Sequence, residues 1–206
     1  MTTYRVPFEN GESAFTEKRS RFISHIWRVE TEAEARERIE EMKKRYYDAR
    51  HNCWCYLLQE GGVVRYSDDG EPQGTAGQPM LNVFQRESVT NVCCVVTRYF
   101  GGVLLGTGGL VRAYTTATSR ALEAAEVVTV RSVVALDVTV DYGLYERADL
   151  LIKAAGGKLA EPEFTDKVTL RWQMPEHTEG PLLTQLQELT RGTANVTVSE
   201  PFYAAF

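Results

Sequence analysis

The feature of this sequence that most constrains its fold is a complete series of alternating strand and helix patterns after residue 130. Four segments there are interpreted as strands: residues 133–140, 158–162, 167–174 and 194–199. All of them except residues 158–162 contain β-branched residues, which favour strands. Two further segments, residues 144–155 and 180–190, have the apolar spacing of helices and are followed by glycine. The order β-α-β-β-α-β is that of the ferredoxin-like unit, complete within one small domain.

The earlier part of the chain predicts a second α+β unit. Four segments have strand patterns: residues 21–29, 52–59, 63–66 and 91–100. Gly61 and Gly62 lie between the second and third of these, which favours a hairpin. A long loop is expected between the third and the fourth.

Two helices complete this unit. The first is expected from Thr31 to about Tyr46, because Thr31 is a good N-cap and Glu34 follows three residues later. The second is expected over residues 107–125, with a narrow apolar stripe dominated by alanine, whose small side chains let it lie close to a sheet: Leu110, Ala113, Ala117, Ala121 and Ala124. The domain boundary is therefore placed near Arg131, giving domains of residues 1–131 and 132–206.

Charge is spread unevenly between these two domains. Residues 1–131 carry 17 Lys and Arg and 17 Asp and Glu, whereas residues 132–206 carry 6 and 11, so the net charge of −5 lies in the second domain. Nonspecific affinity for nucleic acid depends on cations that displace counterions from phosphates. Any RNA contact is therefore expected to use a local basic patch, and no DNA partner is expected.

The amino-terminal residues show no targeting-peptide pattern, and no apolar run approaches the ~20 residues that span a bilayer. The four cysteines are expected to stay reduced in the cytosol. A cytoplasmic protein without a membrane partner is the expectation.

The first of two unusual segments runs from a strand through several glycines into a helix, residues 98–114. Free N–H groups and the helix dipole can hold a phosphate at such a place. The predicted phosphate or RNA site consists of Arg98, Gly101, Gly102, Gly106, Thr107, Gly108, Gly109 and Arg112. Gly106 is not followed by the Lys of a Walker motif, and Val111 replaces the third glycine of a dinucleotide fingerprint, so no cofactor is expected. The alternative is that these glycines serve tight turns and close helix packing.

The second unusual segment is the acidic loop within residues 66–81. Asp68, Asp69 and Glu71 could bind a hard cation, but their spacing is not that of an EF-hand, and turn-forming roles are favoured. Cys53 and Cys55 share a strand face, whereas Cys93 and Cys94 point to opposite faces, so the four do not form a zinc site. No metal is expected. His51 and Cys53 are not predicted to form a catalytic dyad.

Both segments resemble the signature of the amino-terminal domain of the IMPACT family, and the resemblance extends to residues 18–22 and 49–53. It covers residues 15–125, and the remainder resembles the small carboxy-terminal domain of the bacterial, YigZ-like members. The resemblance implies an amino-terminal domain of the ribosomal protein S5 domain 2 type followed by a ferredoxin-like domain, as in two consecutive domains of elongation factor G. The motif loop that it implies comprises His51, Asp68, Asp69, Gly70, Glu71, Pro72, Gly74 and Thr75.

For function, the resemblance implies a broad class of activity and not a defined mechanism. Eukaryotic relatives restrain a translation-control kinase by competing for its ribosome-associated activator, so a translation-linked regulatory binder that contacts the ribosome, RNA or a translation-associated protein is the leading hypothesis. A hydrolase acting on a phosphorylated or peptide substrate in the glycine-rich pocket is the alternative, against which the missing set of catalytic residues counts. A pure protein-docking module is the third.

Overall fold

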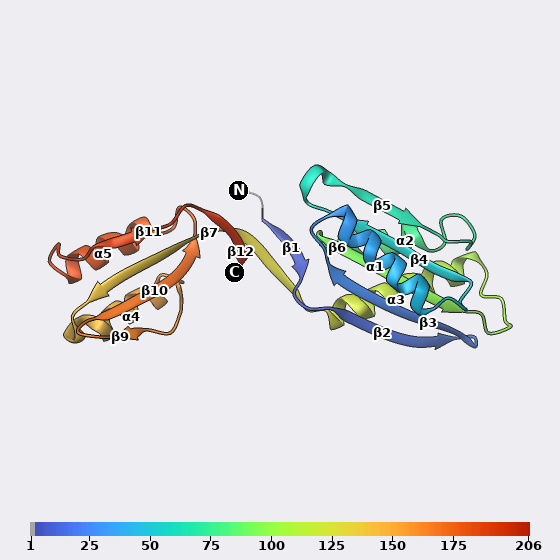
Figure 1. Ribbon diagram of the computed structural model, residues 1–206, viewed down its shortest axis with the longest axis horizontal. Helices are drawn as coiled ribbons and strands as arrows, with labels where there is room; N and C mark the ends of the chain where they lie inside the picture. The colour runs from blue at the N-terminus through green and yellow to red at the C-terminus, as the bar shows by residue number, and fades with distance from the viewer. Residues whose placement is uncertain (1–2) are drawn as a thin grey trace. The chain divides into compact units, whose positions relative to one another are not determined.

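The computed structural model describes residues 3–206 and shows an α+β protein with two β-sheets and five α-helices in the described residues. The chain divides into two compact units (Figure 1). The first comprises Tyr4–Thr129, and the second comprises Thr3 with Val130–Phe206. The predicted fold class is confirmed.

The sheet of the first unit has five strands in the order β2-β3-β6-β4-β5. All its neighbouring strands are antiparallel. The strands are β2 (Gly11–Glu17), β3 (Ser20–Arg28), β4 (His51–Leu57), β5 (Val64–Ser67) and β6 (Val92–Tyr99). A 3-10 turn, η1 (Glu60–Gly62), joins β4 to β5 in the hairpin that the glycine pair predicts.

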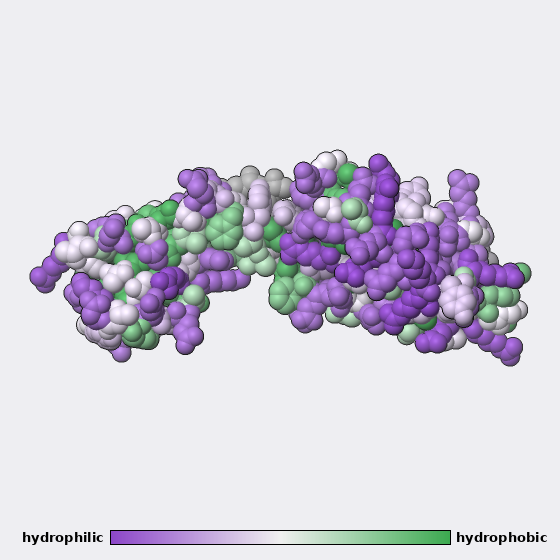
Figure 2. Space-filling model, viewed as in Figure 1, coloured by the Kyte–Doolittle hydropathy of each residue, from purple (hydrophilic) through white to green (hydrophobic). Residues whose placement is uncertain are grey.

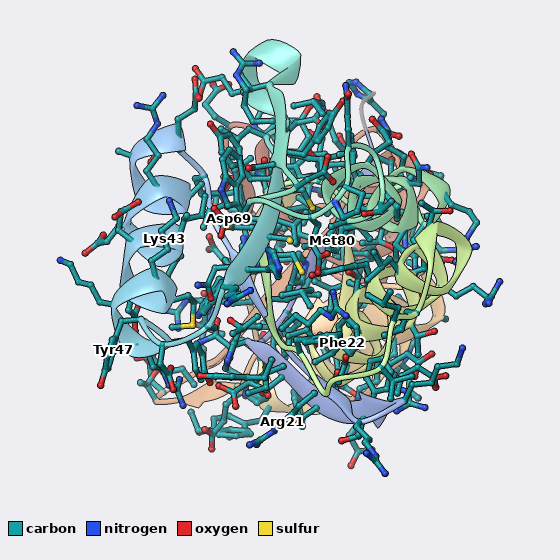
Figure 3. All side chains as sticks on the ribbon, turned by 90° about the vertical axis from the view of Figure 1, so that its right-hand side faces the viewer. Arg21, Phe22, Lys43, Tyr47, Asp69 and Met80 are labelled. Carbon is teal, nitrogen blue, oxygen red and sulfur yellow. The ribbon has the colours of Figure 1, made fainter. Side chains whose placement is uncertain are left out.

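Three helices cover this sheet: α1 (Glu32–Arg45), α2 (Gly77–Arg86) and α3 (Thr107–Ala124). Phe22 and Ile26 of β3 pack in the core with α2 and α3, whereas Trp27 packs in a separate core with α1. Because side chains alternate along a strand, α1 lies on one face and α2 and α3 lie on the other. Figure 3 shows Lys43 of α1 and Met80 of α2 on opposite sides of the sheet.

The helix predicted from Thr31 forms as α1. The Thr31 hydroxyl accepts a hydrogen bond from the Glu34 N–H at 3.2 Å, which satisfies one of the free donors of the first turn. Acidic residues occupy the first turn and basic residues the last, as the helix dipole favours. The outer face of α1 is strongly hydrophilic (Figure 2).

The sequence predicts a long loop between β5 and β6, whereas the structure has a helix there, α2. Its apolar side chains Met80, Val83 and Phe84 have helical spacing and are buried in the core. It begins at Gly77, where a Cβ atom would lie 2.9 Å from the Ser67 backbone, so only glycine lets the helix start this close to β5.

Two early strands, β1 (Tyr4–Pro7) and β2, were also not predicted. Strand β2 lies at the edge of the sheet, and its exposed residues are mostly polar. Edge strands with one exposed side often lack a clear apolar run, which removes the usual sequence signal. In α3, Tyr114 is buried and Ala124 is exposed, so the predicted alanine stripe is shifted at its end.

The second unit has the expected ferredoxin-like topology. The strand order β11-β7-β10-β8 is antiparallel throughout. Its elements are β7 (Val127–Val140), α4 (Tyr142–Ala154), β8 (Lys158–Leu159), β10 (Val168–Pro175), α5 (Gly180–Leu189) and β11 (Val196–Val198). Leu136, Trp172, Ile152 and Leu186 belong to its core.

Three details of this unit differ from the sequence prediction. Strand β7 starts at Val127 and not near residue 133, because the β-branched residues 127–130 extend it. The short strand β9 (Glu163–Phe164) pairs with β10. The last strand, β12 (Phe202–Ala205), pairs with β7, where Ala204 is opposite Arg131.

None of the helices in residues 3–206 is both long and apolar enough to cross a membrane.

Candidate functional site

The two unusual segments of the sequence meet at one pocket of the first unit, with a volume of 870 Å³. We call it the motif pocket. From the acidic loop it is lined by Gly70, Glu71 and Pro72, and from β4 by His51. From the glycine segment it is lined by Arg98, Phe100, Leu104, Leu105, Gly106, Thr107 and Leu110. Asp48, Arg50 and Tyr99 complete the lining.

A buried ion pair joins the two segments in this pocket. Arg98 Nη1 lies 2.7 Å from Glu71 Oε1, and the two side chains are only 6% and 3% exposed. The Tyr114 hydroxyl of α3 donates a hydrogen bond of 2.8 Å to the same Glu71 oxygen. The thiol of Cys53 lies 3.3 Å from the Tyr114 hydroxyl. The acidic loop is thereby attached to β6, α3 and β4.

Arg98 makes further contacts that hold its guanidinium inside the protein. Its Nη2 donates to the Ser20 hydroxyl at 3.3 Å, and the guanidinium lies 5.6 Å from the ring centre of Phe22 and 5.5 Å from that of Phe100. Arg98 Nε is buried without a hydrogen-bond partner among the described residues. The sequence predicts that Arg98 and Arg112 bind a phosphate together. In the structure the charge of Arg98 is instead neutralised by Glu71.

Asp68 organises the acidic loop through backbone hydrogen bonds. Its Oδ1 accepts from the N–H groups of Ala76 and Gly77 at 3.0 and 2.9 Å, and its Oδ2 accepts from that of Gly74 at 2.8 Å. Asp68 therefore satisfies donors at the start of α2, where Ala76 supplies no side-chain cap. The Thr75 hydroxyl donates to the Pro72 carbonyl at 2.6 Å, which closes the same loop.

Asp69 and His51 connect this loop to β4. Asp69 Oδ2 accepts from the Asn52 N–H at 2.7 Å, and His51 Nδ1 lies 3.0 Å from the Asp69 carbonyl oxygen. A carbonyl oxygen can only accept, so Nδ1 of His51 carries a proton and donates it to this hydrogen bond. In the described residues, no group of three or more His, Cys, Asp or Glu is arranged to hold a metal ion.

The four cysteines lie in the interior. Cys53, Cys55 and Cys94 are in the core under α2 and α3, and Cys93 is in the core under α1, as strand alternation predicts. Burial raises the pKa of the Cys53 thiol well above its usual value, and the carboxylates of Glu71, Asp69 and Asp68 add to this effect. Cys53 is therefore a poor nucleophile.

Gly101 and Gly102 have structural roles. A Cβ atom on Gly101 would lie 2.0 Å from the Arg19 carbonyl carbon, and the Gly101 N–H donates to Ser20 Oγ at 3.2 Å. Gly102 has φ +82°, a conformation that glycine adopts without strain. These two positions support the packing alternative that the sequence left open.

Gly106 to Gly109 form the start of α3, with Gly106 as the residue before its first turn. Gly106 is the N-cap residue with no side-chain cap, and no acidic residue occupies the first turn. The Leu110 N–H bonds to the Gly106 carbonyl at 2.9 Å. No hydrogen bond within residues 3–206 uses the N–H groups of Thr107, Gly108 or Gly109.

A second depression, of 380 Å³, lies between the β2–β3 turn and α3. We call it the basic groove, because Lys18, Arg112 and Arg120 line it together with one carboxylate, Glu17. All three cations are exposed, and none forms an ion pair with another described residue. The guanidinium of Arg120 lies 4.9 Å from the ring centre of Phe15. Gly109 lines this groove as well, whereas Gly106 and Thr107 line the motif pocket.

Sequence reasoning found Arg112 but missed Lys18 and Arg120. Arg120 could have been found, because it lies eight residues after Arg112 and two helical turns place both on one face of α3. Lys18 comes from a tight turn, with φ +46°, and only the pairing of β2 with β3 brings it to the helix. The place of Lys18 in the basic groove therefore depends on tertiary structure and has no signal in the sequence.

Comparisons with known proteins agree with this architecture. Residues 18–122 match the Impact N-terminal domain, and residues 138–193 match a domain of unknown function, DUF1949. The chain is 28% identical to a solved structure titled as an hypothetical protein, with a TM-score of 0.61 over 97% of this chain and 98% of that one.

Among curated proteins, the chain is similar to the IMPACT family member YvyE of Bacillus subtilis, 36% identical over 98% of this chain and 94% of the relative. It is 31% identical to the IMPACT family member YigZ of Escherichia coli, over 89% of this chain and 91% of that protein. A Protein IMPACT homolog of Dictyostelium discoideum is 38% identical over 44% of this chain and 27% of its own length. The chain therefore belongs to the IMPACT family.

Proposed function

We propose that this protein is a translation-linked regulatory binder of the cytoplasm that contacts the ribosome or RNA through the basic groove and the first turn of α3. The observation that carries the proposal is the concentration of Lys18, Arg112 and Arg120 in one groove of a chain whose net charge is −5. Family membership supports the link to translation, because the resemblance to eukaryotic members implies regulation at the ribosome.

The groove suits a nucleic-acid backbone for a physical reason. Its three cations are exposed and form no ion pair with the residues that the structure describes, so binding a phosphate does not require breaking such a pair. Gly109, whose N–H has no hydrogen-bond partner in the described residues, lines the groove beside them. Arginine also offers a planar fork of donors that matches phosphate oxygens.

The alternative, a hydrolase in the motif pocket, is supported less well. Glu71 is held in the pair with Arg98, and the thiol of Cys53 has a raised pKa and faces Tyr114. His51 is oriented by a backbone carbonyl and not by a carboxylate. No side chain of the pocket is thus arranged as an activated nucleophile with its own base.

Sedimentation of the full chain with ribosomal particles at graded salt tests the proposal, together with gel-shift binding to single-stranded RNA. Arg112→Glu and Arg120→Glu should each weaken the association. Each lost phosphate contact should reduce the slope of log affinity against log salt by about 0.7 on a single strand. Because both side chains are exposed on α3, the circular dichroism of these variants should match the wild type.

The matched control is Lys44→Glu, which reverses an exposed cation on α1, on the other face of the sheet, that forms no ion pair within residues 3–206. It makes the same change in net charge outside the groove. If Lys44→Glu weakens binding as much as Arg112→Glu, the interaction is general electrostatic attraction. If neither groove variant changes binding to ribosomes or RNA while both stay folded, the proposed function is wrong.

A further inference from the structure

The loop between β6 and α3, residues 100–106, carries large apolar side chains on the surface of the first unit. Phe100, Val103 and Leu104 are 51%, 40% and 82% exposed. We call this segment the apolar loop. It lies beside the β2–β3 turn at one end of the unit (Figure 1). Neighbouring apolar side chains that remain this exposed indicate a surface that a partner covers.

The backbone of the apolar loop offers hydrogen-bond donors to such a partner. The Gly101 N–H donates to Ser20 Oγ at 3.2 Å, whereas the N–H groups of residues 102–105 have no partner among the described residues. The hydrocarbon of a bilayer contains no acceptors, so insertion of the loop would leave these donors unsatisfied at a high cost. A membrane is therefore disfavoured, and a partner with carbonyl or carboxylate oxygens fits.

Cations lie on both sides of the apolar loop. Arg50 lines the motif pocket together with two side chains of the loop. Arg19 lies against Gly101, where an added Cβ atom would be 2.5 Å from the Cβ of Arg19. The cations of the basic groove lie on the other side, because Leu105 lines both hollows. The loop is thus bordered by positive charge.

Fewer carboxylates than cations lie beside the loop. Glu17 lines the basic groove, and Asp48 and Glu71 line the motif pocket, where Glu71 is already neutralised by Arg98. The two remaining carboxylates are outnumbered by five exposed cations that form no ion pair with the described residues: Lys18, Arg19, Arg50, Arg112 and Arg120. The surroundings of the loop therefore attract a negatively charged partner.

The apolar side chains distinguish an acidic protein from a nucleic acid. Bases stack on aromatic rings, so RNA would use Phe100 but would leave the aliphatic side chains of Val103 and Leu104 uncovered. Protein interfaces instead have an apolar centre within a polar rim, and they are enriched in aromatic residues and arginine. The apolar loop with Arg19 and Arg50 beside it has this composition.

We propose that the apolar loop docks an acidic segment of a protein partner. Aliphatic or aromatic side chains of the segment would cover Phe100 and Leu104, and its carboxylates would lie toward Arg19 and Arg50. The hollow of 870 Å³ beside the loop leaves room for a side chain of the segment. This inference goes beyond the proposed function, because the docking requires neither RNA nor the basic groove.

Selection of a phage-displayed library of random peptides on the full chain tests which segments dock. The same selection on Leu104→Ser is the comparison, because this side chain is exposed and its loss leaves the core intact. We expect enriched peptides that combine Leu, Ile or Phe with Asp or Glu and that lose their enrichment on the variant. Enrichment of basic peptides, equal enrichment on both proteins or no enrichment at all would overturn the proposal.

Fluorescence anisotropy of one enriched peptide, synthesised with a label, measures the contribution of each side chain. Leu104→Ser and Arg50→Glu should each weaken binding by about 5- to 30-fold, as expected for residues that dominate an interface. Arg50→Glu should also reduce the salt dependence. Because both side chains are exposed, the circular dichroism of these variants should match the wild type.

Two matched controls make the same kinds of change elsewhere. Phe8→Ser alters an exposed phenylalanine beyond the other end of β2, and Arg147→Glu reverses an exposed cation of the second unit. Both should leave the affinity for the peptide unchanged. If either control weakens binding as much as the loop variants do, the docking is not specific to the apolar loop and the proposal is wrong.

Vesicles of phosphatidylcholine and phosphatidylserine, and single-stranded RNA, test the other occupants. Sedimentation of the wild type but not of Leu104→Ser with the vesicles would make the loop a membrane contact and overturn the proposal. An equal loss of RNA affinity in Leu104→Ser and Arg112→Glu would assign the loop to an RNA surface, with the same consequence.

The two proposals fail in different ways. If no peptide is enriched while Arg112→Glu still weakens RNA binding, the docking proposal fails and the proposed function stands. If a peptide docks through Leu104 and neither groove variant changes binding to ribosomes or RNA, the proposed function fails and the docking site stands.

Discussion

Arg98 and Glu71 are 27 residues apart in sequence, yet their side chains form an ion pair of 2.7 Å that is almost completely buried. The pair joins the end of β6 to the acidic loop, so that both unusual segments of the sequence depend on it for their position. Taking two charges out of water is costly, and the arrangement tolerates this cost because Tyr114 and Ser20 add hydrogen bonds to the pair.

Glu71→Ala should therefore destabilise the first unit strongly. The substitution leaves the Arg98 guanidinium buried and uncompensated, which costs about 3–5 kcal/mol. Urea unfolding followed by tryptophan fluorescence measures the effect. The comparison is Glu163→Ala, which breaks the exposed pair with Arg171 and should cost about 1 kcal/mol or less. If both variants lose the same free energy of unfolding, the buried Arg98–Glu71 pair matters no more for stability than the exposed Arg171–Glu163 pair.

Tyr114→Phe tests the hydroxyl that bonds to Glu71. The ring stays in place, packed edge-on against Phe22 at 5.3 Å, while the hydrogen bond of 2.8 Å to Glu71 is lost. The free energy of unfolding should fall by about 1–3 kcal/mol, because a buried carboxylate loses one donor. In the Glu71→Ala background the same change should cost much less. Additive losses in this double-mutant cycle would contradict a direct contact.

The ferredoxin-like unit could be predicted from the sequence because each of its elements carries its own pattern. Residues 133–140 and 167–174 are long strands with one buried face, so alternation alone identifies them. Helix α2 could not be predicted in this way. The donors at its start are satisfied by Asp68, nine residues before Gly77, and no cap residue stands next to it.

The candidate site was predictable in part. Glycines and acidic residues mark the two segments that line the motif pocket, but residue type does not reveal which charges are used internally. Arg98 and Arg112 look equivalent in sequence, whereas the register of β6 against β3 places Arg98 beside Phe22 and under Glu71. Arg112 projects from α3 into the basic groove. The division of their roles depends on tertiary contacts.

Gly101→Ala should destabilise the turn between β2 and β3. The added Cβ would meet the Arg19 backbone at 2.0 Å, so the loop must move, at a cost of about 1–3 kcal/mol or more. Gly143→Ala is the opposite case, because Gly143 lies in α4 and the added Cβ would meet no described atom within 4 Å apart from its chain neighbours and the backbone of its own helix. It should stabilise the protein by about 0.4–1 kcal/mol. Thermal unfolding of both variants checks the difference in sign.

The cysteines should be unreactive in the folded protein. Burial raises the pKa of Cys93 to about 12 and those of Cys53, Cys55 and Cys94 further, so little thiolate is present at pH 8. Titration with an aromatic disulfide reagent should label none of the four thiols in the native state and all four in guanidinium chloride. Rapid labelling of one native thiol would show that a strand opens locally.

His25 should make the stability of the first unit depend on pH. It lies between Glu12, 3.0 Å from Nδ1, and the Tyr46 hydroxyl, 3.0 Å from Nε2. Burial lowers its pKa below the ordinary 6.5, an effect that the charge of Arg45 reinforces and that Glu12 and Glu41 oppose without cancelling. The unfolded chain therefore binds more protons than the folded one just below pH 6.5.

The resulting stabilisation is complete above pH 6.5 and is lost as the pH falls through the folded-state pKa of His25. Urea unfolding between pH 7 and pH 5 should show a smaller loss of stability for His25→Gln than for the wild type. His177→Gln, at an exposed histidine, should follow the wild type. Glu12→Gln removes an exposed carboxylate that favours the charged ring of His25. It should therefore lower the pKa of His25 further and increase the loss of stability at acid pH. NMR titration of the His25 ring measures that pKa directly, and a value above 6.5 would reverse the sign of the whole effect.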